Sequence, residues 1–146
     1  MEYLDILNNI NEEDQEIKLK PHDRVLIIDG LNLFFRNFAT INLTNNNGAH
    51  IGGLGGFLRS MGTLINKVQP TSIYVIFDGK GSTVNRKNIN PDYKANRNIN
   101  RITNWDSFDS LEDEHESKLD QLLRLVQYLK LLPVKILSFD KAEADD

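Results

Sequence analysis

Short uninterrupted apolar runs recur along the chain, separated by longer periodic stretches. Three of these runs are rich in β-forming residues: RVLIID at 24–29, SIYVIFD at 72–78 and VKILSF at 134–139. The first two each end in Asp-Gly. Runs of this length and composition are typical of strands buried in a parallel sheet. We therefore expect three strands, the first of them fully buried.

Helical periodicity fills the intervals between these runs. Apolar residues recur at spacings of three and four within 31–38, 51–68 and 119–132, and a proline follows each of the last two stretches. Ser110, with Asp113 three residues later, resembles a capping box at the start of the third helix. Strands that alternate with helices predict an α/β fold, in which helices flank a parallel sheet.

Two stretches lack this regularity. Residues 1–23 are acidic and rich in Asn, and we interpret them as a peripheral extension with one short helix. Residues 44–56, TNNNGAHIGGLGG, have the Asn and Gly content of a loop, and the GGLGG part is expected to be a flexible entry to the second helix. The domain itself is therefore predicted at 24–146.

Length and composition limit the class of protein. The chain has 146 residues, 40% of them hydrophobic, which suits one globular domain. It has no Cys, so a disulfide framework or a thiolate metal site is excluded. No apolar run is long enough to span a membrane, and the acidic start is unlike a signal peptide. These features predict a soluble, cytoplasmic protein.

Charge is segregated along the chain. The formal net charge is −4, yet residues 80–104 hold six Lys and Arg against Asp92 alone, a local charge of +5. Residues 105–120 then hold seven acids against Lys118, a local charge of −6. A basic segment in an acidic protein indicates a negatively charged partner such as a nucleic-acid backbone. A solvated loop is the structural alternative.

Carboxylates follow the ends of all three predicted strands. Asp29 ends the first and Asp78 the second, and the third is followed by Asp140, Glu143, Asp145 and Asp146. Strand carboxyl ends share one edge of a parallel sheet, where ligands bind. Carboxylates gathered there would repel one another unless a cation such as Mg²⁺ or Mn²⁺ neutralised them. Turn chemistry for Asp-Gly and a solvated helix start for 143–146 are the structural alternatives.

Four motifs in order resemble the 5′-3′ exonuclease and flap endonuclease family, which has a PIN-like domain and includes phage ribonuclease H members. They are VLIIDGLNLFFR, YVIFDG, PDYKANR and AEADD. The resemblance implies a PIN-like, Rossmann-like sheet and an arch-like basic segment at about 80–104. The metal ligands that it implies are Asp29, Asp78, Glu143, Asp145 and Asp146. Lys94 and Arg97 would be catalytic, and the nucleic-acid contacts would be Arg86, Lys87, Tyr93, Lys94, Arg97 and Arg101.

The implied activity is that of a metal-dependent 5′ nuclease with two ions in the complete protein. It would hydrolyse DNA, or RNA paired with DNA, near 5′ ends or flaps, in replication or repair. We expect a monomer that works with replication proteins and has no membrane partner. The family's next acidic motif would follow Asp146, so the domain looks truncated and residues 1–146 alone are expected to be weakly active or inactive.

Three alternatives remain open. A PIN or NYN type ribonuclease shares IDGLN and a carboxylate cluster, although PDYKANR argues against it. A haloacid dehalogenase type phosphatase needs a second Asp two residues after the first, and that position is Leu31. A non-catalytic module could grip flaps without cutting them. The histidines His22, His50 and His115 are predicted to lie on the surface.

Overall fold

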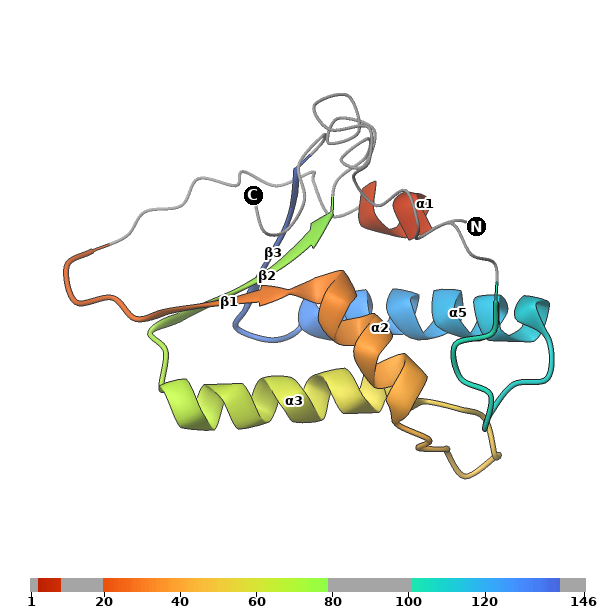
Figure 1. The fold of residues 1–146 in the computed structure, drawn as a ribbon. Helices are drawn as coiled ribbons and strands as arrows, with labels where there is room; N and C mark the ends of the chain where they lie inside the picture. The colour runs from red at the N-terminus through yellow and green to blue at the C-terminus, as the bar shows by residue number, and fades with distance from the viewer. Residues whose placement is uncertain (1–2, 9–19, 79–100, 140–146) are drawn as a thin grey trace, which may run out of the picture.

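Three parallel strands form the sheet in the computed structural model, which describes residues 3–8, 20–78 and 101–139 (Figure 1). They are β1 (Val25–Asp29), β2 (Ser72–Asp78) and β3 (Lys135–Phe139), in the order β1-β2-β3. All three strands run in the same direction, so their carboxyl ends lie along one edge. The predicted strands and the α/β class with a parallel sheet are confirmed.

Three longer helices lie on the same side of this sheet in Figure 1. They are α2 (Gly30–Thr40), α3 (Gly52–Val68) and α5 (Leu111–Leu129). Their apolar stripes meet the inward-facing side chains of the strands in one core, because a strand presents alternate residues to each face. The fully buried members of this core are Phe34, Phe38, Phe57, Val75, Phe77, Leu122, Leu125 and Leu129.

The prediction that β1 is fully buried is wrong. Among the strands of the described residues, β1 pairs with β2 alone and lies at the edge of the sheet. Its Ile28 points into the core, whereas Ile27, on the opposite face, is 61% exposed. An apolar run therefore identified the strand correctly but did not reveal that one of its faces is open.

The N-terminal extension is not entirely peripheral, as its sequence had suggested. Helix α1 (Tyr3–Asn8) inserts Ile6 and Leu7 into the core, where each is 2% exposed. The ring of Tyr3 packs edge-on against Phe35 and against His115 of α5. A single turn and a half of helix thus contributes to the core, because its apolar residues find a surface between α2 and α5.

The glycines of GGLGG are close-packing positions and not a flexible entry. They form the first turns of α3, where Gly52, Gly53 and Gly56 are buried against α2 and the loop after it. A methyl group at Gly52 would overlap the carbonyl oxygen of Ile41, and one at Gly56 would lie 2.6 Å from Oδ1 of Asn37. The absence of side chains is what lets α3 approach α2 so closely.

Helix α5 begins as the sequence predicts and ends earlier. The backbone N–H of Asp113 donates to Oγ of Ser110 at 3.1 Å, which confirms the predicted cap. The helix ends at Leu129, and a turn leads to Pro133, leaving Leu131 83% exposed. In the described part of the chain, no helix combines the length and the apolar character that crossing a bilayer requires.

Candidate functional site

Asp29 and Asp78 end two neighbouring strands at the same edge of the sheet. In the register of the sheet Asp29 lies opposite Ile76, so Asp78 extends two residues beyond it on the adjacent strand. The spacing between strands and the rise along them separate the two Cα atoms by roughly 8 Å. Two carboxylates at this separation can both reach one cation. The structure thus brings together two of the predicted metal ligands.

Asp29 has a local structural role as well. It is the N-cap of α2, with an extended backbone, and its Oδ1 accepts a hydrogen bond of 3.1 Å from the backbone N–H of Asn32. The side chain is exposed and its second oxygen, Oδ2, takes no part in this bond. One carboxylate can therefore cap the helix and still present an oxygen at the sheet edge. Asp78 is half-buried at the end of β2.

Most of the other predicted site residues lie outside the described residues. These are Arg86, Lys87, Tyr93, Lys94, Arg97, Glu143, Asp145 and Asp146. Arg101 is described, and it is exposed. Within 3–8, 20–78 and 101–139, no group of three or more His, Asp or Glu side chains is placed to hold a metal ion. The described part of the candidate metal site consists of Asp29 and Asp78.

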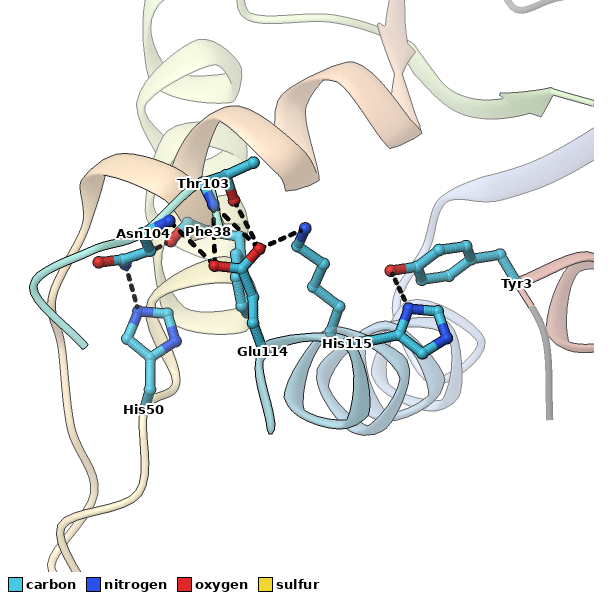
Figure 2. Close-up of polar contacts among 8 residues, drawn as sticks. Tyr3, Phe38, His50, Thr103, Asn104, Glu114 and His115 are labelled. Carbon is cyan, nitrogen blue, oxygen red and sulfur yellow. Dashed lines mark hydrogen bonds and ion pairs between the residues drawn. The ribbon is translucent and has the colours of Figure 1, made fainter. Parts of the chain in front are cut away.

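Sequence analysis missed a buried carboxylate at the start of α5. Glu114 is 1% exposed and accepts hydrogen bonds from the backbone N–H groups of Thr103 and Asn104 (Figure 2). Its Oε1 also pairs with Nζ of Lys118 at 2.9 Å. Burial alone would raise the pKa of this carboxyl, but these hydrogen bonds and the Lys118 charge hold the pKa below its ordinary value.

The prediction of a surface position for His50 is wrong, whereas His22 and His115 are exposed as predicted. His50 is 9% exposed, and its Nε2 lies 2.8 Å from the carbonyl oxygen of Ile41. Its Nδ1 lies 3.0 Å from Nε2 of Gln121. Burial lowers the pKa of the imidazole, against the opposing effect of the Ile41 carbonyl. Both ring nitrogens are occupied, so His50 is a structural residue.

One signal in the sequence could have identified Glu114 as a buried polar residue. Glu114 precedes Gln121 by seven residues and Leu125 by eleven, so all three lie on one face of α5. Glu114 and Gln121 are thus polar residues on the face of α5 that otherwise carries the apolar stripe. Polar residues in such a stripe are buried only if partners elsewhere in the chain satisfy them.

A cleft of about 790 Å³ lies beside the buried His50 and Gln121, and no residue of β1, β2 or β3 lines it. It is lined by the loop before α3, by residues 106–108 and by α5, and its charged residues are the acidic Asp106, Asp113, Glu116 and Asp120 and the basic Arg124. Such a lining repels phosphate groups. The cleft is therefore unsuited to a nucleic-acid backbone, and the sheet edge remains the better candidate.

Comparison with known proteins identifies a matching family and several similar proteins. The family model described as the 5′-3′ exonuclease, N-terminal resolvase-like domain, matches residues 24–146. The 5′-3′ exonuclease of Bacillus subtilis (strain 168) is 31% identical over 93 residues, which cover 60% of this chain and 31% of that protein. DNA polymerase I of Lactococcus lactis subsp. lactis (strain IL1403) is 27% identical over 133 residues, 88% of this chain and 14% of the polymerase.

Solved structures of the bacteriophage T5 enzyme share the fold. The T5 5′-exonuclease with bound zinc ions superposes with a TM-score of 0.58 at 20% identity, covering 84% of this chain and 41% of that one. The T5 flap endonuclease in a complex with DNA and metal ions gives 0.55 at 21% identity, with 83% and 40% covered. This chain thus spans less than half of each relative named above. Its residues 24–146 match the N-terminal resolvase-like domain, and the chain belongs to the 5′-3′ exonuclease family.

Proposed function

We propose that this chain supplies the amino-terminal catalytic part of a divalent-metal-dependent 5′ nuclease. The enzyme hydrolyses phosphodiester bonds near 5′ ends or flaps of DNA, or of RNA paired with DNA, in replication or repair such as primer removal. The observation that carries the proposal is the position of Asp29 and Asp78 at the carboxyl ends of adjacent parallel strands. Family membership supports the same reaction.

The described donors fit a hard divalent cation. Asp29 and Asp78 offer oxygen ligands alone, the chain has no Cys, and His50 uses both ring nitrogens within the fold. Oxygen ligands favour Mg²⁺ or Mn²⁺. We assign the remaining ligands to Glu143, Asp145 and Asp146, which follow β3. The chemistry that bound metal supplies here is activation of water and neutralisation of charge on the phosphate.

Basic residues hold the substrate beside these carboxylates. Lys94 and Arg97 offset charge on the scissile phosphate, because a fixed cation stabilises charge that develops in the transition state. The sugar-phosphate backbone is contacted by Arg86, Lys87, Tyr93 and Arg101. Because the basic residues are separated from the acidic ones, an acidic protein can bind nucleic acid at one place without binding it over its whole surface.

Cleavage of a 5′-labelled flap duplex by the full natural protein tests this proposal. The expected result is a short labelled product with Mg²⁺ or Mn²⁺ and none with EDTA. Flap binding without product in either buffer would assign a binding module instead. Equal cleavage of single-stranded RNA with no dependence on a 5′ end would assign a PIN or NYN type ribonuclease.

A further inference from the structure

The Glu114 carboxylate is bonded to one short stretch of chain. The backbone N–H of Thr103 contacts both carboxylate oxygens at 3.1 and 3.0 Å, and its hydroxyl donates to Oε1 at 3.0 Å. The N–H of Asn104 donates to Oε2 at 3.0 Å. Figure 2 shows these bonds converging on one side chain. A buried carboxylate is destabilising unless it is fully paired, so the arrangement depends on these donors together with the ammonium group of Lys118.

Asn104 is fixed in turn to the C-terminal half of α2 and to the loop that follows it. Its side-chain Nδ2 donates to the carbonyl oxygen of Phe38 and to Oδ1 of Asn42, each at 2.9 Å. Asn104 is 2% exposed. The chain at 103–104 is therefore attached to two helices at once, α2 through Asn104 and α5 through Glu114.

Helix α2 links residues 103–104 to the candidate metal site. Asp29 caps its first turn, and Phe38 lies nine residues later in the same helix. At a rise of 1.5 Å per residue, the two points are about 13 Å apart along a rigid axis. The bonds of Glu114 and Asn104 thus fix the position of residues 103–104 relative to Asp29.

Arg101 lies immediately before this attachment. It is exposed, and one residue, Ile102, separates it from Thr103, so its Cα lies within about 7 Å of a fixed residue. A cation held near a fixed point loses less conformational entropy on meeting a phosphate than one on a free chain.

We propose that Glu114 is a positioning residue for nucleic-acid binding, which holds Arg101 at a set distance from the Asp29 edge so that it contacts a backbone phosphate. The inference rests on the proposed function, because the ligand is the substrate of that function. Glu114 itself is buried and contacts no substrate.

The test is equilibrium binding of a fluorescent 5′-flap DNA in EDTA over a series of KCl concentrations, below the unfolding temperature of every variant. We expect Arg101→Ala to weaken binding several-fold and to reduce the slope of log K against log salt by about 0.9, the value for one phosphate contact. Glu114→Gln should do the same. The double variant should be no weaker than the weaker single variant, since both changes remove one contact.

Two further variants keep the test decisive. Glu116→Gln removes an exposed acid from the same helix and should not weaken binding or reduce the slope. Thr103→Val removes one bond to Glu114 without removing the carboxylate, and it should give a smaller loss in the same direction even if Glu114→Gln fails to fold. Wild-type affinity and slope in Thr103→Val and in any folded Glu114→Gln, or losses that multiply in the double variant, would overturn the positioning role alone. Absence of flap binding by the wild-type protein would overturn both proposals.

Discussion

Nε2 of Gln121 lies 3.0 Å from Nδ1 of His50, and the opposite nitrogen of the His50 ring lies 2.8 Å from the carbonyl oxygen of Ile41. A carbonyl oxygen can only accept, so the ring proton is on Nε2 and Nδ1 accepts from Gln121. A second proton on Nδ1 would face the Gln121 amide donor. The fold therefore requires a neutral His50.

Stability should consequently fall as the pH falls below the ordinary histidine value of about 6.5. Burial lowers the pKa of folded His50, so in the window below 6.5 the unfolded chain holds more protons than the folded chain. One such group changes the free energy of unfolding by at most about 1.4 kcal/mol per pH unit. Urea unfolding from pH 7.5 to about 5.5 measures this slope. It should be shallower in His50→Gln and unchanged in His22→Asn, an exposed control; equal slopes in all three would contradict the prediction.

The glycines of α3 should respond in opposite directions to the same substitution. Gly52→Ala places a methyl group on the carbonyl of Ile41 and should destabilise the chain by about 1–3 kcal/mol or more. Gly62→Ala, in the same helix with nothing within 4 Å of the new methyl, should stabilise it by about 0.5–1 kcal/mol. Chemical denaturation of the two variants checks this. Similar changes in both would mean that α3 does not approach α2 as closely as described.

Two substitutions of Asp29 should distinguish its role in capping α2 from its proposed role in metal binding. Asp29→Asn keeps an oxygen that can accept from the Asn32 N–H but removes the charge, so stability should remain near wild type. Asp29→Ala should lose about 1 kcal/mol because the cap is gone. Under the proposed function, both variants of the full natural protein should lose flap cleavage by roughly a hundredfold or more, while flap binding persists.

The control for this pair is Asp109→Asn, which removes an exposed acid elsewhere in the chain. Asp78→Asn should behave as Asp29→Asn does in cleavage. Thermal unfolding, single-turnover cleavage and binding are measured on each variant. Normal cleavage by Asp29→Asn or Asp78→Asn would show that these carboxylates are not metal ligands.

Ser110 should stabilise the start of α5 through its hydroxyl. Ser110→Ala removes the acceptor for the Asp113 N–H and should lower the free energy of unfolding by about 1 kcal/mol. Ser110→Asn retains an acceptor and should remain close to wild type. Thermal unfolding of the two variants gives the comparison, and no difference between them would show that the cap contributes nothing.

Structural features that depend on neighbouring residues along the chain could be predicted from the sequence. The run SIYVIFD predicted β2 to the residue, and Ser110 with Asp113 predicted the first residue of α5. The placement of Asp29 and Asp78 at one sheet edge also followed, because parallel strands bring their carboxyl ends together whatever the detail of their packing.

Short-range patterns and a general rule of chain topology were therefore enough to predict the strands, the helices, the parallel arrangement of the strands and the common edge of two carboxylates. Long-range packing was needed to show that His50 and Glu114 are buried, that GGLGG is a contact between helices and that Ile27 is exposed. Polar burial depends on partners far along the chain, as Gln121 is 71 residues from His50. Only the packed fold shows whether such partners meet.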